Sequence, residues 1–83
     1  MDLVTGGYNP LGIAPIAVTS SPFMYTNSDG VSEVIYLAGG TVTQVVKNGV
    51  TLFTRTNVTV WLEPGESVTV TYSSTPSMFK DMK

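Results

Sequence analysis

The 83-residue chain contains no cysteine and no histidine, and it carries only four basic and six acidic residues. Without cysteine there is no disulfide, and without thiolate or imidazole the chain lacks the ligands of most structural zinc sites. Folding a chain of this mass buries roughly 8,000 Å² and contributes about 120 kcal/mol, while ordering the residues costs about as much. We therefore expect the fold to be stabilised by further copies of the chain, as a dimer or trimer, or by a larger partner.

The shortage of charge narrows the range of partners. A net charge of −2 provides no basic field for phosphates, so we expect no nucleic acid to bind. The most apolar stretch, residues 11–18, is short and is interrupted by Gly12 and Pro15, unlike a signal peptide or a membrane span. We therefore expect synthesis in the cytoplasm and no membrane partner.

The side chains needed for catalysis are also scarce. Twenty Ser and Thr residues have no histidine to activate them, which argues against a nucleophilic triad. Glu63 and Glu66 flank a tight turn, but a glycosidase pair needs a cleft that so small a chain has little material to build. Asn27, Asp29 and Glu33 offer oxygen ligands but match the calcium-loop pattern only in part. We predict no enzyme, no cofactor and no metal site.

The chain is rich in β-branched residues instead. Val and Thr make up 24 of its 83 residues, which favours strands over helices. We predict an all-β fold, a small antiparallel β-sandwich or partly closed β-barrel of five to seven short strands with an extended N-terminal arm. The expected strands are Phe23–Asn27, Ser32–Ala38, Thr41–Lys47, Val50–Thr54, Asn57–Leu62 and Ser67–Tyr72, with Pro15–Ser20 as an additional one.

Turn signals separate these strands. Asn48-Gly49 is the pair that best closes a two-residue type I′ hairpin, because both positions need a positive φ. Pro64-Gly65 matches a type II turn, so we expect the strand that ends at Leu62 to pair antiparallel with Ser67–Tyr72. With Gly39-Gly40 as a further reversal, the pattern predicts strands that run up and down in sequence order.

The two ends of the chain differ from the middle. Residues 1–22 carry one charge, Asp2, together with three glycines and three prolines. We expect an extended arm that packs on a neighbouring chain or adds an edge strand to its own sheet. We therefore divide the chain into an N-terminal arm (1–22), a β module (23–77) and a C-terminal tail (78–83).

Trp61 interrupts the alternation of its strand, because it lies on the face opposite Val58, Val60 and Leu62. Such a residue packs inside the sandwich, contacts another subunit or stacks on a sugar. The residues that we predict at a partner interface are Leu3, Tyr8, Leu11 and Ile13 from the arm, with Trp61 and Phe79 from the rest of the chain.

Four segments together resemble the small β modules that recur in virion proteins of tailed bacteriophages. They are residues 21–27 (SPFMYTN), 39–42 (GGTV), 62–74 (LEPGESVTVTYSS) and 76–78 (PSM). Such modules occur in capsid decoration or cement proteins, in head fibres and in tail proteins. No functional residue carries over, because the recurring positions are turn glycines, a proline and core valines.

The resemblance implies a structural virion protein. Because this chain is little more than the module and an arm, we expect a decoration protein that binds the major capsid protein on the outer surface of the phage head. The alternatives are a tail, baseplate or head-fibre component, and a carbohydrate-binding or adhesion module that uses Trp61 to bind a glycan.

Overall fold

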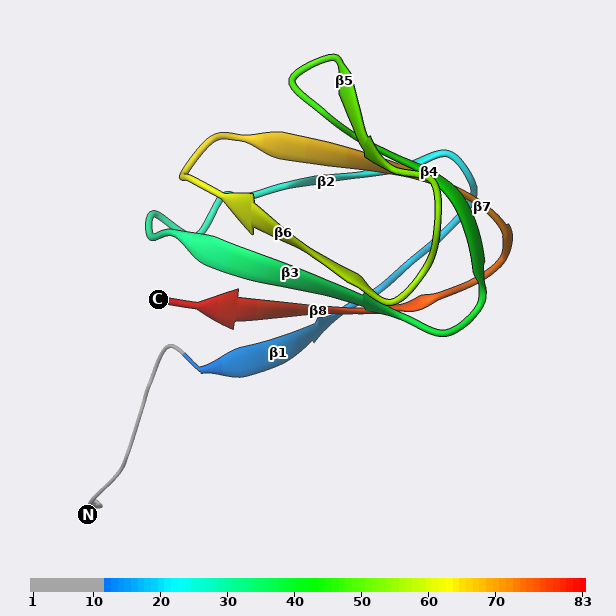
Figure 1. Cartoon of the computed structure of the whole chain (residues 1–83). Coiled ribbons are helices and arrows are strands. Elements are labelled where there is room, and N and C mark those ends of the chain that lie inside the picture. The colour runs from blue at the N-terminus through cyan, green and yellow to red at the C-terminus, as the bar shows by residue number, and fades with distance from the viewer. Residues whose placement is uncertain (1–11) are drawn as a thin grey trace.

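The computed structural model describes residues 12–83, which form two four-stranded antiparallel sheets facing each other (Figure 1). One sheet has the strand order β1-β8-β3-β6 and the other β2-β7-β4-β5. This confirms the predicted all-β sandwich, and the sheets do not close into a barrel. The strands are β1 (Ile13–Ile16), β2 (Phe23–Thr26), β3 (Glu33–Ala38), β4 (Thr41–Lys47), β5 (Val50–Phe53), β6 (Val58–Leu62), β7 (Ser67–Ser74) and β8 (Ser77–Met82).

The strand pairing follows a simple rule. Strands β1, β2, β3 and β4 pair antiparallel with β8, β7, β6 and β5 respectively. The chain is thus a long two-stranded ribbon that is rolled up, so that β3 also pairs with β8 and β4 with β7. Eight strands in two sheets connected in this way form a jelly roll.

The tip of the ribbon is the predicted hairpin. Asn48 and Gly49 have φ angles of 53° and 75°, as the type I′ turn requires. They join β4 to β5, which confirms the prediction at this turn. In residues 12–83 this is the one connection between successive strands that stays within a sheet.

The predicted up-and-down order is wrong. The Pro64-Gly65 turn forms, but it carries the chain from β6 in one sheet to β7 in the other. Strand β6 pairs with β3, and β7 pairs with β2 and β4. Each strand has one apolar face, and stacking the two strands across the sandwich buries both faces against each other.

The core lies between the sheets and is filled by the inward side chains of five strands, β3, β4, β6, β7 and β8. Val45 and Val46 point to opposite faces of β4, so that only Val45 is fully buried. The buried apolar residues are Ile35, Leu37, Val42, Val45, Val58, Val60, Leu62, Val68, Val70 and Met78.

The predicted boundaries at the two ends need correction. Residues 77–82 form β8, which lies between β1 and β3, so the expected tail from residue 78 is a paired inner strand. Within the expected arm, residues 13–16 form β1, an edge strand of the same sheet, which is one of the two alternatives predicted for the arm. The alternation in β8 is hard to recognise because its inward positions combine Met78 with Lys80, and its outward positions Phe79 with Asp81. With β1 and β8 included, there are eight strands instead of five to seven.

The Gly39-Gly40 turn between β3 and β4 lies against the connection from β7 to β8. A Cβ atom on Gly40 would be 2.6 Å from the Ser74 carbonyl oxygen and 2.7 Å from the Pro76 nitrogen. With a φ of 63° as well, the position requires glycine for both space and backbone conformation. No helix in residues 12–83 is long and apolar enough to cross a membrane.

Candidate docking face

The sheet β1-β8-β3-β6 has an outer side that is unusually rich in apolar and aromatic residues. Alternation along the strands turns one set of side chains into the core and leaves the other set outside. We call this outer side the aromatic face. It consists of Ile13, Pro15, Val34, Tyr36, Thr59, Trp61, Phe79 and Asp81.

The register arranges these residues in two rows across the sheet. Phe79 pairs with Pro15 of β1 on one side and with Tyr36 of β3 on the other. In the second row, Val34 pairs with both Asp81 and Trp61. Directly paired side chains lie about 4.5–5.5 Å apart at Cβ. Residues from four strands therefore form one continuous patch.

Several large side chains of this patch are open to solvent. The exposed fraction is 66% for Ile13, 47% for Trp61 and 37% for Phe79. Val34 and Tyr36 between them are half-buried. Exposed apolar groups that gather in a patch, unlike scattered ones, are typical of interaction sites.

The outer side of the other sheet has a different composition. Its positions are mostly hydroxyl and amide side chains, which bond to one another, as Thr26 does to Ser67 at 2.7 Å and Gln44 to Thr51 at 2.9 Å. Three large apolar residues of this sheet are also exposed, Met24 on β2 and Val50 and Leu52 on β5. The two outer sides differ in their aromatic residues, since the exposed Trp61 and Phe79 both lie on the aromatic face.

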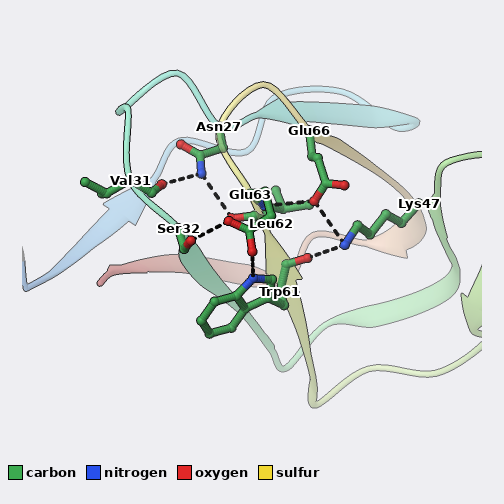
Figure 2. Close-up of polar contacts among 8 residues, drawn as sticks. All are labelled: Asn27, Val31, Ser32, Lys47, Trp61, Leu62, Glu63 and Glu66. Atoms are coloured by element: carbon green, nitrogen blue, oxygen red, sulfur yellow. Dashed lines mark hydrogen bonds and ion pairs between the residues drawn. The ribbon is translucent and has the colours of Figure 1, made fainter.

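Trp61 is held in place at its polar edge. Its indole Nε1 donates a hydrogen bond to Glu63 Oε2 at 2.7 Å, and the Ser32 hydroxyl donates to the other oxygen of the same carboxylate (Figure 2). The hydrogen bonds from Ser32 and Trp61 lower the pKa of Glu63. The ring is thus oriented before any partner arrives, which reduces the side-chain entropy lost on binding.

The free edge of β6 beside Trp61 is covered by Lys47. Its Nζ donates to the Trp61 carbonyl oxygen at 2.7 Å and lies 3.1 Å from Glu66 Oε1 (Figure 2). Glu66 Oε1 also accepts the backbone N–H of Glu63 at 2.8 Å, and this bond is the main cause of a lowered pKa at Glu66. Glu63 and Glu66 therefore serve to fix the turn and the tryptophan.

Asn27 braces the same end of the molecule from inside. It is fully buried, and its Nδ2 donates to the carbonyl oxygens of Val31 at 2.7 Å and Leu62 at 3.1 Å (Figure 2). Its Oδ1 accepts the backbone N–H of Asp29 at 3.0 Å. The sequence reasoning considered Asn27 as a cation ligand, but its amide is engaged in holding the chain between β2 and β3 to the end of β6.

The one acidic group of the aromatic face is paired. Asp81 Oδ2 lies 2.9 Å from Lys83 Nζ and accepts a longer hydrogen bond of 3.4 Å from the Tyr36 hydroxyl. This contact with Asp81 raises the pKa of Lys83. The face is therefore close to electrically neutral.

The structure brings together three of the predicted interface residues, Ile13, Trp61 and Phe79, on the aromatic face. Their role in binding stays a prediction. Tyr36 and Val34 were missed, although they alternate with the apolar Ile35 and Leu37 and could have been recognised from that pattern. The remaining predicted residues, Leu3, Tyr8 and Leu11, lie outside the described residues.

Residues 12–83 contain no pocket and no group of three or more acidic, histidine or cysteine side chains that could hold a metal ion. Comparison of the chain with protein-family models, with curated proteins and with solved structures gave no match.

Proposed function

We propose that the chain is a structural protein of a tailed-phage virion, a decoration protein that binds the outer surface of the head and stabilises it. The proposal rests on the resemblance of residues 21–78 to phage β modules and on the aromatic face. The jelly-roll strand order agrees with it, since this fold is common in viral capsid domains. Fold alone does not decide function.

The observation that carries the proposal is the exposed cluster of Trp61, Phe79 and Ile13 on one rigid sheet. A preoriented tryptophan surrounded by apolar neighbours is the kind of residue that dominates protein–protein binding energy. We propose that this face lies on the major capsid protein. Dimerisation or trimerisation of the chain stays a prediction and would add avidity.

The mechanism of stabilisation is mechanical. A protein that binds the assembled shell, and not the free subunits, lowers the free energy of the shell by RT ln(1 + [L]/Kd) per site. Many copies acting in parallel add up over the surface of the head, and linked copies gain effective concentration.

The test is co-sedimentation with heads assembled from the major capsid protein of the same phage. We expect Trp61→Ala and Phe79→Ala to weaken binding by about tenfold or more each. Met24→Ala is the control, because Met24 is also a large exposed apolar residue but lies on the other sheet. Unchanged binding of both aromatic variants would reject the aromatic face as the docking surface.

The contribution of the arm needs a separate variant. Deleting residues 1–11 leaves β1 complete, whereas a longer deletion to residue 20 would also remove a paired strand. We expect the shorter deletion to weaken head binding while the fold is retained. Undiminished binding would mean that the interface lies within residues 12–83.

Glycan binding is the second candidate, favoured by the exposed ring of Trp61 and by the occurrence of jelly rolls in lectins. A glycan array with the purified chain distinguishes the two. If the chain binds a glycan, loses that binding on Trp61→Ala and does not bind to heads, glycan binding becomes the proposed function and head decoration is rejected.

A further inference from the structure

Glu33, the first residue of β3, is fully buried, with 0% of its surface exposed. Its Oε1 accepts a hydrogen bond of 2.8 Å from the Tyr25 hydroxyl. Its Oε2 is also buried and has no hydrogen-bond partner in residues 12–83. A buried carboxylate oxygen left without a partner is costly, so its presence in the fold needs a physical reason.

A second carboxyl group, that of Asp29, lies close to Glu33. The Tyr25 hydroxyl joins the two, since it bonds to Glu33 Oε1 at 2.8 Å and also lies 3.3 Å from Asp29 Oδ2. Lys80 of β8 donates to that same Asp29 oxygen at 2.8 Å. Two neighbouring carboxylates repel each other when both are ionised, and one shared proton can turn the repulsion into a hydrogen bond.

We propose that Glu33 and Asp29 share one proton in the folded protein. The shared proton holds the connection between β2 and β3 against the end of the sandwich, and we call this protonated pair the latch. Glu33 holds the proton, and its Oε2 donates it to the Asp29 carboxylate. The remaining negative charge on Asp29 is balanced by the Lys80 ammonium. In this state every buried oxygen of the pair has a partner.

The surroundings of Glu33 support this protonation state. Burial raises the pKa of Glu33, and contact with Asp29 raises it further. The same contact, followed by Lys80, lowers the pKa of Asp29. Burial and the neighbouring Glu33 raise the pKa of Tyr25, which keeps its hydroxyl a donor. The group that faces Glu33 from β6 is the apolar Leu62.

The latch is connected to the aromatic face through Ser32. This residue precedes Glu33, and its hydroxyl bonds to Glu63, which in turn accepts the indole N–H of Trp61 (Figure 2). The chain has a single tryptophan. A change in the β2–β3 connection should therefore be visible in the fluorescence of Trp61.

The direction of the pH effect follows from linkage. Because the pKa of Glu33 is raised in the fold, its contribution to stability is complete below its ordinary value of 4.5 and is lost as pH rises through the folded-state value. For Asp29 the direction is opposite, and its contribution is lost as pH falls through its lowered pKa. The latch therefore stabilises the fold most at pH values between the lowered pKa of Asp29 and the raised pKa of Glu33.

The experiment is a carboxyl ¹³C NMR titration of the intact chain, which has only three glutamates. We expect Glu33 to titrate above 4.5, and Glu63 and Glu66 below it. Trp61 fluorescence should change with the same midpoint as Glu33. A Glu33 midpoint at or below 4.5 overturns the proposal, and this measurement needs no variant that could fail to fold.

Glu33→Gln provides the second test, because an amide reproduces the protonated carboxyl at every pH. We expect it to remove the loss of stability above pH 4.5 and the accompanying fluorescence change. Glu66→Gln changes a half-buried glutamate at the same end of the molecule. It is the matched control and should keep both. If Glu33→Gln retains the pH dependence of the unmodified chain, the latch is rejected.

Discussion

Trp61 shows how one side chain can be both exposed and firmly positioned. Its ring is half open to solvent, while its N–H is bonded to Glu63 and its carbonyl oxygen to Lys47. These contacts come from the turn that follows β6 and from Lys47 at the end of β4, and they do not require a partner. The residue is therefore ready to bind without a rearrangement, which is the property expected of a docking anchor.

Asn27 is the residue whose structural role is most easily tested. Replacing it with alanine removes its hydrogen bonds to the part-buried carbonyl oxygen of Val31 and the buried carbonyl oxygen of Leu62. We predict that Asn27→Ala lowers the free energy of unfolding by about 2–4 kcal/mol, measured by urea denaturation.

The neighbouring Thr26→Ala is the control for this change. Thr26 is exposed, and among residues 12–83 its side chain bonds to the Ser67 hydroxyl alone, so the loss should stay within about 1 kcal/mol. An Asn27→Ala variant as stable as Thr26→Ala, or one that is destabilised only when a divalent cation is present, would contradict the bracing role.

Among the strands and turns, the sequence predicted local features better than pairing partners. The Asn48-Gly49 hairpin and most strand positions follow from φ requirements and alternation, which are properties of neighbouring residues. The sheet to which a strand belongs depends on residues far away in the chain, so the Pro64-Gly65 turn was assigned to the wrong pairing. Strand β8 was missed because Lys80 occupies one of its inward positions.

The turn between β3 and β4 offers a matched pair of glycine substitutions. Gly39 and Gly40 both have positive φ, but a Cβ on Gly39 would meet nothing within 4 Å, whereas one on Gly40 would overlap the backbone of residues 74–76. We predict a loss of about 1–2 kcal/mol for Gly39→Ala from backbone strain alone. Gly40→Ala should cost at least about 2 kcal/mol more, because the β7–β8 connection must move.

Thermal and urea unfolding of the two variants measure this difference. Equal stabilities would mean that the turn does not lie against the β7–β8 connection, and the folding of the ribbon at that point would have to be revised.

At the scale of the whole molecule, the jelly roll produces two unlike outer sides from one chain. Rolling the ribbon brings β1 and β8, from opposite ends of the described residues, beside β3 and β6 and so assembles the aromatic face from distant segments. Ile13, Trp61 and Phe79 could be predicted one at a time from their apolar character in the sequence. That they share one face could not be predicted, because it depends on the register of β8.

The proposed binding of the aromatic face to the phage head is tested most directly by a cryo-electron microscopy reconstruction of heads decorated with the chain. We predict that the sheet β1-β8-β3-β6 faces the shell, with Trp61 and Phe79 buried against the major capsid protein. A reconstruction in which the hydroxyl-rich sheet faces the shell, with Trp61 pointing to solvent, would contradict it.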